Sequence, residues 1–393
     1  MKKTLFTLAA AALFSLSGAL LMAGESPTEA TIVKLTGAVT VQLPGQATAE
    51  TLKVGDKVPQ GATIVTGPGA EAYIQPFAGT VAALKQNATV VLEKLSISTD
   101  NGVVTKQNAL LNLKSGDLVS TIDPAKRAIN NYGVRTPKGI AMAHGTAYSV
   151  SVSGGGFSIA ATADSVTFTT PAGVVYSIQA GMISITPPGG TPQPPVALAS
   201  IASNNPAVAA IIQEAVTTFA TMVQNNLGGL SAESTTMLAA QVAGVAAAAM
   251  PEQASAFTAQ IVTAVTASTA ATGGSATALA NAVASVTAAA VTAAPQQSAQ
   301  IASAAATAAP AQAGAIVAAV SEAAPAFTDA ATQSVAQATG QSVAVVTQAA
   351  QAAAVQVNQT VVATTPAVQS VITPVPPTTI PTPVDTSVVS PSS

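Results

Sequence analysis

The chain has 393 residues, of which only 7% are charged, and it contains no cysteine, no tryptophan and a single histidine. The lack of cysteine excludes a disulfide scaffold, a cysteine nucleophile and thiolate metal ligands, and one histidine excludes a histidine-rich metal site. All 13 lysines and arginines lie within residues 1–138, and the remainder carries only Asp164, Glu214, Glu233, Glu252, Glu322, Asp329 and Asp385. Because that remainder has no cation to neutralise phosphates, we expect no nucleic-acid binding.

Residues 1–23 have the pattern of an export signal. Lys2 and Lys3 precede an apolar run over residues 5–23 that ends in small residues. This pattern is typical of a signal peptide cleaved after Ala23 or, alternatively, after Ala19. An uncleaved membrane anchor is the other interpretation, whereas a lipid anchor would need a cysteine. We therefore expect an exported protein that is periplasmic, on the cell surface or secreted.

Residues 31–186 form short runs of alternating apolar and polar side chains, bounded by Gly, Pro, Asn and Asp. Such runs predict β-strands. They cover residues 31–36, 39–43, 62–66, 72–77, 81–84, 89–92, 148–152, 157–161, 166–168, 174–178 and 182–185, and Ser115-Gly116-Asp117 is predicted to be a turn. Turns that recur about every 8–10 residues predict an antiparallel meander forming a sandwich, roll or short β-solenoid.

Seven motifs follow one another within this β region. They are TGAVTV at residues 36–41, LKVGDKV at 52–58, GATIVTG at 61–67, YIQPFAGT at 73–80, LNLKSGDL at 111–118, VRTPKG at 134–139 and HGTAYSV at 144–150. In this order they resemble the FecR-type domain of bacterial envelope proteins, over about residues 31–186. The last two motifs are the most specific, although His144 stands where the family usually has Arg and Ala147 where it usually has an acid.

The resemblance implies a set of structural motif residues. They are Gly37, Gly55, Asp56, Gly67, Gly116, Arg135, Thr136, Pro137, Gly139, Gly145 and Thr146. It also implies a place in the envelope: founding members are regulators with a cytoplasmic anti-sigma segment and a membrane span, and other members are exported proteins of unassigned role.

The physical roles of two kinds of motif residue can be argued from the residues alone. Gly37, Gly55, Gly67, Gly116 and Gly145 lie between apolar runs, which predicts turns. Arg135 lies within an apolar strand and needs an anionic partner if it is buried. Asp117 and Asp123 are both candidates for that partner.

The C-terminal half differs in composition from the β region. Residues 187–205 are rich in Pro and Gly and are predicted to be a linker, and residues 206–365 are mostly Ala, Val, Thr, Gln and Ser. Prolines at 206, 251, 295, 310 and 325 are spaced by 45, 44, 15 and 15 residues. This spacing predicts short helices of about twelve residues, each beginning near a proline.

Apolar residues six and ten positions after these prolines support the helical prediction. Ile212 and Val216 are one such pair; the others are Phe257 with Ile261 and Ile316 with Val320. A spacing of four places each pair on one helix face, and Asn205 is the predicted N-cap of the first helix. Because short helices are unstable alone, they must stack on one another. A partly disordered Ala-rich segment is the alternative, and residues 366–393, rich in Pro and Thr, are predicted to be a disordered tail. No stable membrane span is expected in the mature chain.

No catalytic, cofactor or metal site is predicted. His144, Ser149 and Asp164 suggest a catalytic triad, but a separation of five places His144 and Ser149 on opposite faces of a strand. Asp100-Asn101-Gly102 resembles the start of a calcium loop, yet the later carboxylates are missing and a hairpin turn explains it.

Three functional hypotheses follow. The first is an exported, non-enzymatic binding or scaffold protein of the cell envelope, whose partner is an unknown envelope component or protein. The second is a periplasmic regulatory or signal-transducing component. The third is a secreted surface or matrix protein that self-associates through residues 206–365.

Overall fold

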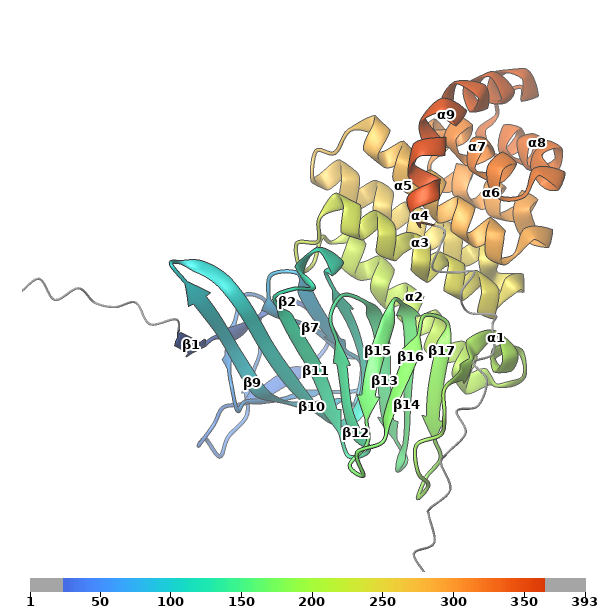
Figure 1. The fold of residues 1–393 in the computed structure, drawn as a ribbon. Helices are drawn as coiled ribbons and strands as arrows, with labels where there is room; N and C mark the ends of the chain where they lie inside the picture. Colours follow the sequence, from blue (N-terminus) through green and yellow to red (C-terminus); the bar gives the residue numbers. More distant parts are fainter. Residues whose placement is uncertain (1–23, 365–393) are drawn as a thin grey trace, which may run out of the picture.

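The computed structural model describes residues 24–364, with side chains from Glu25 to Ala354. A β-rich part comes first and a stack of helices follows it (Figure 1). This confirms the predicted fold class, a mainly β domain followed by an Ala-rich helical region. The predicted signal peptide at 1–23 and the predicted tail at 366–393 lie outside the described residues.

The first β-sheet has the strand order β4-β3-β6-β9-β10-β11-β12-β15-β16, with β1 paired to the far end of β9. Its strands are β1 (Gly24–Pro27), β3 (Val39–Gln42), β4 (Glu50–Thr51), β6 (Thr63–Thr66), β9 (Thr89–Asp100), β10 (Val103–Ile122), β11 (Asn130–Thr136), β12 (Gly139–Ala143), β15 (Ser165–Thr169) and β16 (Val175–Gln179).

The second β-sheet has the order β5-β2-β7-β8-β10-β13-β14-β17-β18. Its further strands are β2 (Glu29–Thr36), β5 (Lys57–Pro59), β7 (Glu71–Phe77), β8 (Thr80–Leu84), β13 (Ala147–Ser153), β14 (Gly156–Ala163), β17 (Met182–Thr186) and β18 (Val196–Ala197).

Strand β10 belongs to both sheets and joins them. Its first half pairs with β9 and β11, and its second half pairs with β8 and β13. The turn predicted at Ser115-Gly116-Asp117 is therefore wrong, since the strand continues through these residues. Gly116 has φ +88° beside a register shift between Leu113 and Ser115, so the backbone changes direction there without reversing. The β10–β11 pairing is parallel and departs from the antiparallel meander.

The two sheets pack face to face around one apolar core. Inward side chains alternate with outward ones along the strands, as the period-2 pattern predicts. Ile64, Leu111 and Phe168 from the first sheet share this core with Ile74 and Ile159 from the second. The arrangement is a β-sandwich, which is one of the three architectures, sandwich, roll or short β-solenoid, expected from the sequence. Asp100, Asn101 and Gly102 form the β9–β10 hairpin turn as predicted, with positive φ at both central residues.

The helical region contains eight α-helices after a short first one, α1 (Leu198–Ile201), within the described residues. They are α2 (Pro206–Gln224), α3 (Ala232–Ala249), α4 (Ala254–Ala271), α5 (Ala276–Ala293), α6 (Ser298–Ala308), α7 (Ala313–Ala323), α8 (Thr328–Thr339) and α9 (Val343–Thr364). Short 3₁₀ turns precede several of them: η2 (Ala202–Asn204), η3 (Pro251–Gln253), η4 (Pro295–Gln297), η5 (Pro310–Gln312) and η6 (Pro325–Phe327), and η1 (Pro124–Lys126) lies in the β domain.

These helices stack in two layers. The main contacts of each helix from α2 to α7 are with the second helix along the chain, so α2, α4, α6 and α8 form one layer and α3, α5, α7 and α9 the other. This is the architecture of an α-solenoid, in which each helix is stabilised by its neighbours. The predicted face residues Ile212, Val216, Phe257, Ile261, Ile316 and Val320 are all buried.

The prolines begin helices or 3₁₀ turns as predicted, and Asn205 Oδ1 caps α2 by accepting from the amides of Ala207 and Val208. The uniform length of about twelve residues is wrong for the first half of the array, where α2 to α5 have 18 or 19 residues. Two helices fit between successive prolines there because α3 and α5 begin at serine N-caps, Ser231 and Ser275, instead of at proline.

The predicted linker, residues 187–205, is only partly irregular. It contains β18, α1 and η2, and Leu198 and Ala202 are buried in the apolar core of the helical stack. The second half of this segment thus connects the two regions by packing.

Two of the described helices, α2 and α5, are long and apolar enough to cross a membrane by length and composition alone. Half of each is buried within the fold, which is also the pattern of a core helix.

Candidate functional site

The structure places most of the motif residues in turns. Four of the five predicted turn glycines lie between strands, and Gly116 lies inside β10. Gly145 leaves no room for a side chain, because a Cβ there would lie 2.7 Å from Pro124 Cα. Asp56 accepts a hydrogen bond from the Lys53 amide at 2.7 Å and closes the turn before β5. These residues shape the sandwich.

The motif at residues 134–139 forms the β11–β12 hairpin. The Thr136 hydroxyl donates to the Gly139 carbonyl at 3.1 Å and accepts from the Lys138 amide at 3.2 Å, so it holds the turn that contains Pro137. Thr146, from the next motif, donates to the Ala163 carbonyl. Both threonines are buried. Among the described residues, their hydroxyl groups form hydrogen bonds only with backbone atoms.

Arg135 pairs with neither of its two predicted partners. Its side chain is 40% exposed, and Nε lies 2.9 Å from an oxygen of Glu93, which also accepts from Asn112 at 3.0 Å. Glu93 is the extra residue of a β-bulge, opposite the Leu110–Leu111 step. The three side chains form a charged group on the outward side of the first sheet.

The two rejected partners have other roles. Asp123 caps η1 through the Ala125 amide at 2.9 Å and accepts from Ser234 of α3 at 2.5 Å. Asp117 lies on β10 near Glu214, where its charge contributes to raising the pKa of that carboxyl. Both aspartates therefore belong to the side of the sandwich that meets the helices.

The outward face of the second sheet is covered by helices. Strand β8 is buried at every position, so it has protein on both sides. Tyr73, Val81 and Ala83 pack against Met222 of α2, and Ala160 and Ile183 belong to the core of the helical stack. The sandwich and the solenoid are thus joined by an apolar interface.

A charged cluster that sequence analysis did not predict lies at this interface. Lys85 follows β8, its side chain is 11% exposed, and Nζ lies 2.5 Å from Glu71, 3.1 Å from Thr218 and 3.7 Å from Glu214. Burial is the main factor that raises the pKa of Glu214, and Lys85 opposes it. Burial, and then the charge of Glu71, raises the pKa of Tyr73 far above its usual range. One lysine therefore pairs with two acids, Glu71 and Glu214, where the two regions meet.

The raised pKa of Glu214 predicts a pH dependence. A carboxyl that binds its proton more tightly in the folded state stabilises the fold below its ordinary pKa, about 4, and this contribution is lost as pH rises through the raised value. Replacing Glu214 with glutamine should remove this component, so the stability difference between variant and wild type should grow in favour of the variant from pH 4 to pH 7. Urea titrations at several pH values measure it, and a pH-independent difference would contradict it.

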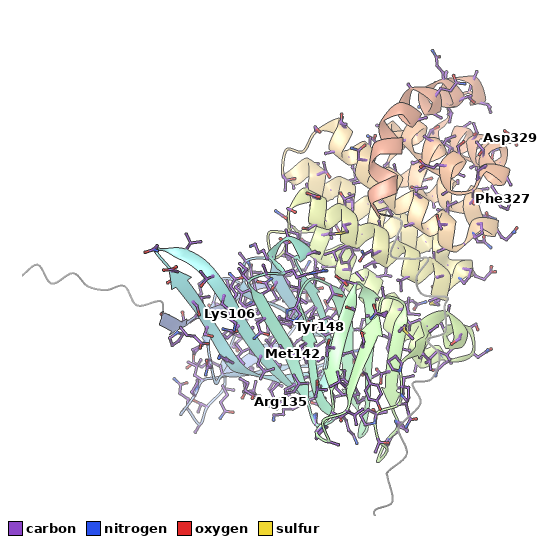
Figure 2. The ribbon with its side chains drawn as sticks, in the orientation of Figure 1. Lys106, Arg135, Met142, Tyr148, Phe327 and Asp329 are labelled. Atoms are coloured by element: carbon purple, nitrogen blue, oxygen red, sulfur yellow. The ribbon has the colours of Figure 1, made fainter. Side chains whose placement is uncertain are left out.

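The outward face of the first sheet is not covered by any described element. We call it the open face; its side chains are at least partly exposed and include Thr40, Val65, Glu93, Asn112, Lys114, Arg135, Ile140, Met142, Thr167, Val175 and Ser177. Figure 2 shows Arg135 and Met142 on this sheet, away from the solenoid. The contrast between a covered and an open sheet makes this face the candidate site for a partner.

The three side chains of the suggested triad have different neighbours. His144 Nδ1 bonds the Asn130 carbonyl at 3.1 Å, and Asp164 pairs with Arg127. Ser149 Oγ is buried without a hydrogen-bond partner among the described residues. Nor do those residues contain a group of three His, Cys, Asp or Glu placed to hold a metal ion.

Comparison with known proteins supports the domain assignment. Residues 62–167 match the family "FecR protein", so the chain carries a FecR-type domain, as the sequence motifs predicted. The match covers the centre of the predicted range of 31–186, and the strands on either side complete the same sandwich.

Two crystal structures of a proposed anti-sigma factor from Parabacteroides distasonis are similar to part of the chain, each with 14% sequence identity and a TM-score of 0.28. The similarity covers 36% of this chain and 63% or 62% of theirs, so less than two thirds of their length is matched. No curated protein matches the chain.

Proposed function

We propose that this protein is an exported, non-enzymatic binding protein of the bacterial cell envelope, in which the FecR-type domain presents its open face to a partner. One observation carries the proposal: helices cover one sheet of the sandwich, whereas the other sheet displays charged and polar side chains that no described element contacts. The solenoid would hold the domain or space it from another envelope component.

Site-specific photocrosslinking in cells would test this function. A photoreactive residue would replace Val65, Thr167 or Ser177 on the open face and, as matched controls, the exposed Glu252 or Gln333 on the solenoid. We expect the same crosslinked species from the three open-face positions and not from the controls. Crosslinks from the solenoid positions alone would place the partner elsewhere and overturn the proposal.

The FecR match favours a second candidate, a periplasmic regulatory or signal-transducing component. This candidate predicts altered transcription of envelope genes when the protein is deleted. Transcript profiles that stay unchanged, while open-face crosslinks persist, would remove regulation and keep binding. Self-association through residues 206–365 stays a prediction, which light scattering of the mature chain across a concentration series would check.

A further inference from the structure

A groove with a positive rim lies at one end of the open face. Its cavity volume is about 370 Å³, and its walls include Thr105, Lys106, Arg127, Asn130, Asn131 and His144. These residues come from β10, the segment after η1, the start of β11 and the segment after β12. The β10–β11 register, which pairs Asn108 with Asn131, brings them together. Figure 2 places Lys106 on the β9–β10 side of the sheet.

A fixed row of polar side chains runs into this groove. Asn131 donates to Asn108 Oδ1 at 3.0 Å, and Asn108 donates to Ser96 Oγ at 3.3 Å and to Glu25 at 3.3 Å. Glu25 also accepts from Ser96 and pairs with Lys94. Because each amide in the row is held by its neighbour, Asn131 is oriented before any ligand arrives.

His144 is oriented by the backbone. Its Nδ1 lies 3.1 Å from the Asn130 carbonyl, and a carbonyl can only accept, so Nδ1 carries a proton. The other ring nitrogen, Nε2, makes no hydrogen bond among the described residues, and the side chain is exposed.

The charges around the groove favour a negative ligand. Lys106 makes no ion pair within residues 25–354, and Arg127 pairs with Asp164 but keeps further N–H donors. Glu25 is already engaged by Lys94 and the polar row. The groove is therefore lined by one lysine outside any described ion pair, whose charge also helps to lower the pKa of Glu25, and by one guanidinium with spare donors.

Buried amides behind the groove have unmet hydrogen-bonding capacity. Asn130 is 3% exposed, and neither of its side-chain polar atoms has a partner in the part of the chain described. Gln107, its neighbour across β10 and β11, has an unpartnered Oε1. These two side chains face the core side of the sheet, like Tyr132 and Ala109 on the same strands, so a ligand on the outward side would not contact them.

We propose that this groove binds an oxyanion, the carboxylate or phosphate of an envelope component. Lys106 and Arg127 would neutralise the charge, and Asn131 would fix its orientation by hydrogen bonding. The lining contains no Phe, Tyr or Trp, so the proposed recognition rests on charge and hydrogen bonds. The proposal rests on the proposed binding function, because it names the chemistry of one part of the open face.

The test titrates the mature chain with inorganic phosphate and, separately, with a trigalacturonate oligosaccharide, followed by ¹⁵N nuclear magnetic resonance at low salt. We expect saturable shifts at the Asn131 amide and at neighbouring backbone amides. Lys106→Gln should weaken binding about tenfold, since a charge-assisted hydrogen bond is lost. Lys114→Gln, the same charge change elsewhere on the open face, should leave binding within about twofold.

Each outcome decides a specific point. Tighter binding of trigalacturonate assigns the oxyanion to a carboxylated glycan, whereas competition by phosphate at equal affinity assigns it to a free or headgroup phosphate. Absence of saturable binding by both probes, or equal losses of affinity in Lys106→Gln and Lys114→Gln, would overturn the proposal that the groove binds an oxyanion. If the open-face crosslinks persist in Lys106→Gln while probe binding is absent in wild type, the groove fails and the binding function stands.

Discussion

Replacing Lys85 with methionine should lower the free energy of unfolding by about 3 kcal/mol, because it removes the cation that two partly buried acids share. Lys85 Nζ lies 2.5 Å from Glu71 and 3.7 Å from Glu214. Loss of one partner from a buried pair usually costs about 3–5 kcal/mol. The two glutamates are about one third exposed, 31% and 32%, so solvent reduces the cost to the lower end of that range.

Lys114→Met is the matched control, since Lys114 is exposed on the open face and makes no ion pair within the described residues. Its effect should stay within about 0.5 kcal/mol. The double variant Lys85→Met with Glu71→Gln should recover part of the loss, because one orphaned charge is also removed. Urea unfolding measures the free energies, and hydrogen exchange in α2 should rise in Lys85→Met. Equal effects of Lys85→Met and Lys114→Met would mean that the cluster does not hold the solenoid to the sandwich.

The strands and helix faces could be predicted because their signals are local. Period-2 alternation gave the strands around Gly37 and Gly67 nearly residue by residue, and the spacing of four gave Ile212 with Val216. Asn205 was found for the same reason, since an N-cap bonds amides two and three residues away. None of these features depends on how distant parts of the chain meet.

The partner of Arg135 could not be predicted because it depends on register across three strands. Glu93 reaches it only through the bulge opposite Leu110 and Leu111, which shifts the neighbouring pairings of β9 with β10 by one residue. A purely periodic interpretation places no bulge there. The two aspartates considered from the sequence lie toward the covered side of the sandwich instead.

The interface between sandwich and solenoid had a signal that pattern analysis missed. Residues 81–84 are apolar at every position and not at alternate ones, which indicates a strand with protein on both faces. A similar signal marked the extra helices: Gly228-Gly229 and Gly273-Gly274 precede Ser231 and Ser275, the serine N-caps of α3 and α5. A search for proline alone overlooked these starts.

Gly116→Ala should be strongly destabilising, with a loss of more than about 3 kcal/mol or failure to fold. Two costs combine at this position. Its φ of +88° is strained for any residue with a Cβ. A Cβ there would also lie 2.4 Å from the Cα of Ala88, which is backbone and cannot rotate away.

Gly55→Ala separates these two costs, because Gly55 has a similar φ of +94° and open space around the added Cβ. It should cost only the conformational strain, about 1–2 kcal/mol. Ala88→Gly combined with Gly116→Ala should recover part of the difference, since it removes the Ala88 side chain but leaves its backbone in place. Thermal and urea unfolding of the three variants measure this order. Equal losses of stability for Gly116→Ala and Gly55→Ala would contradict the prediction. They would show that the close approach of residue 116 to Ala88 adds no cost to the backbone strain.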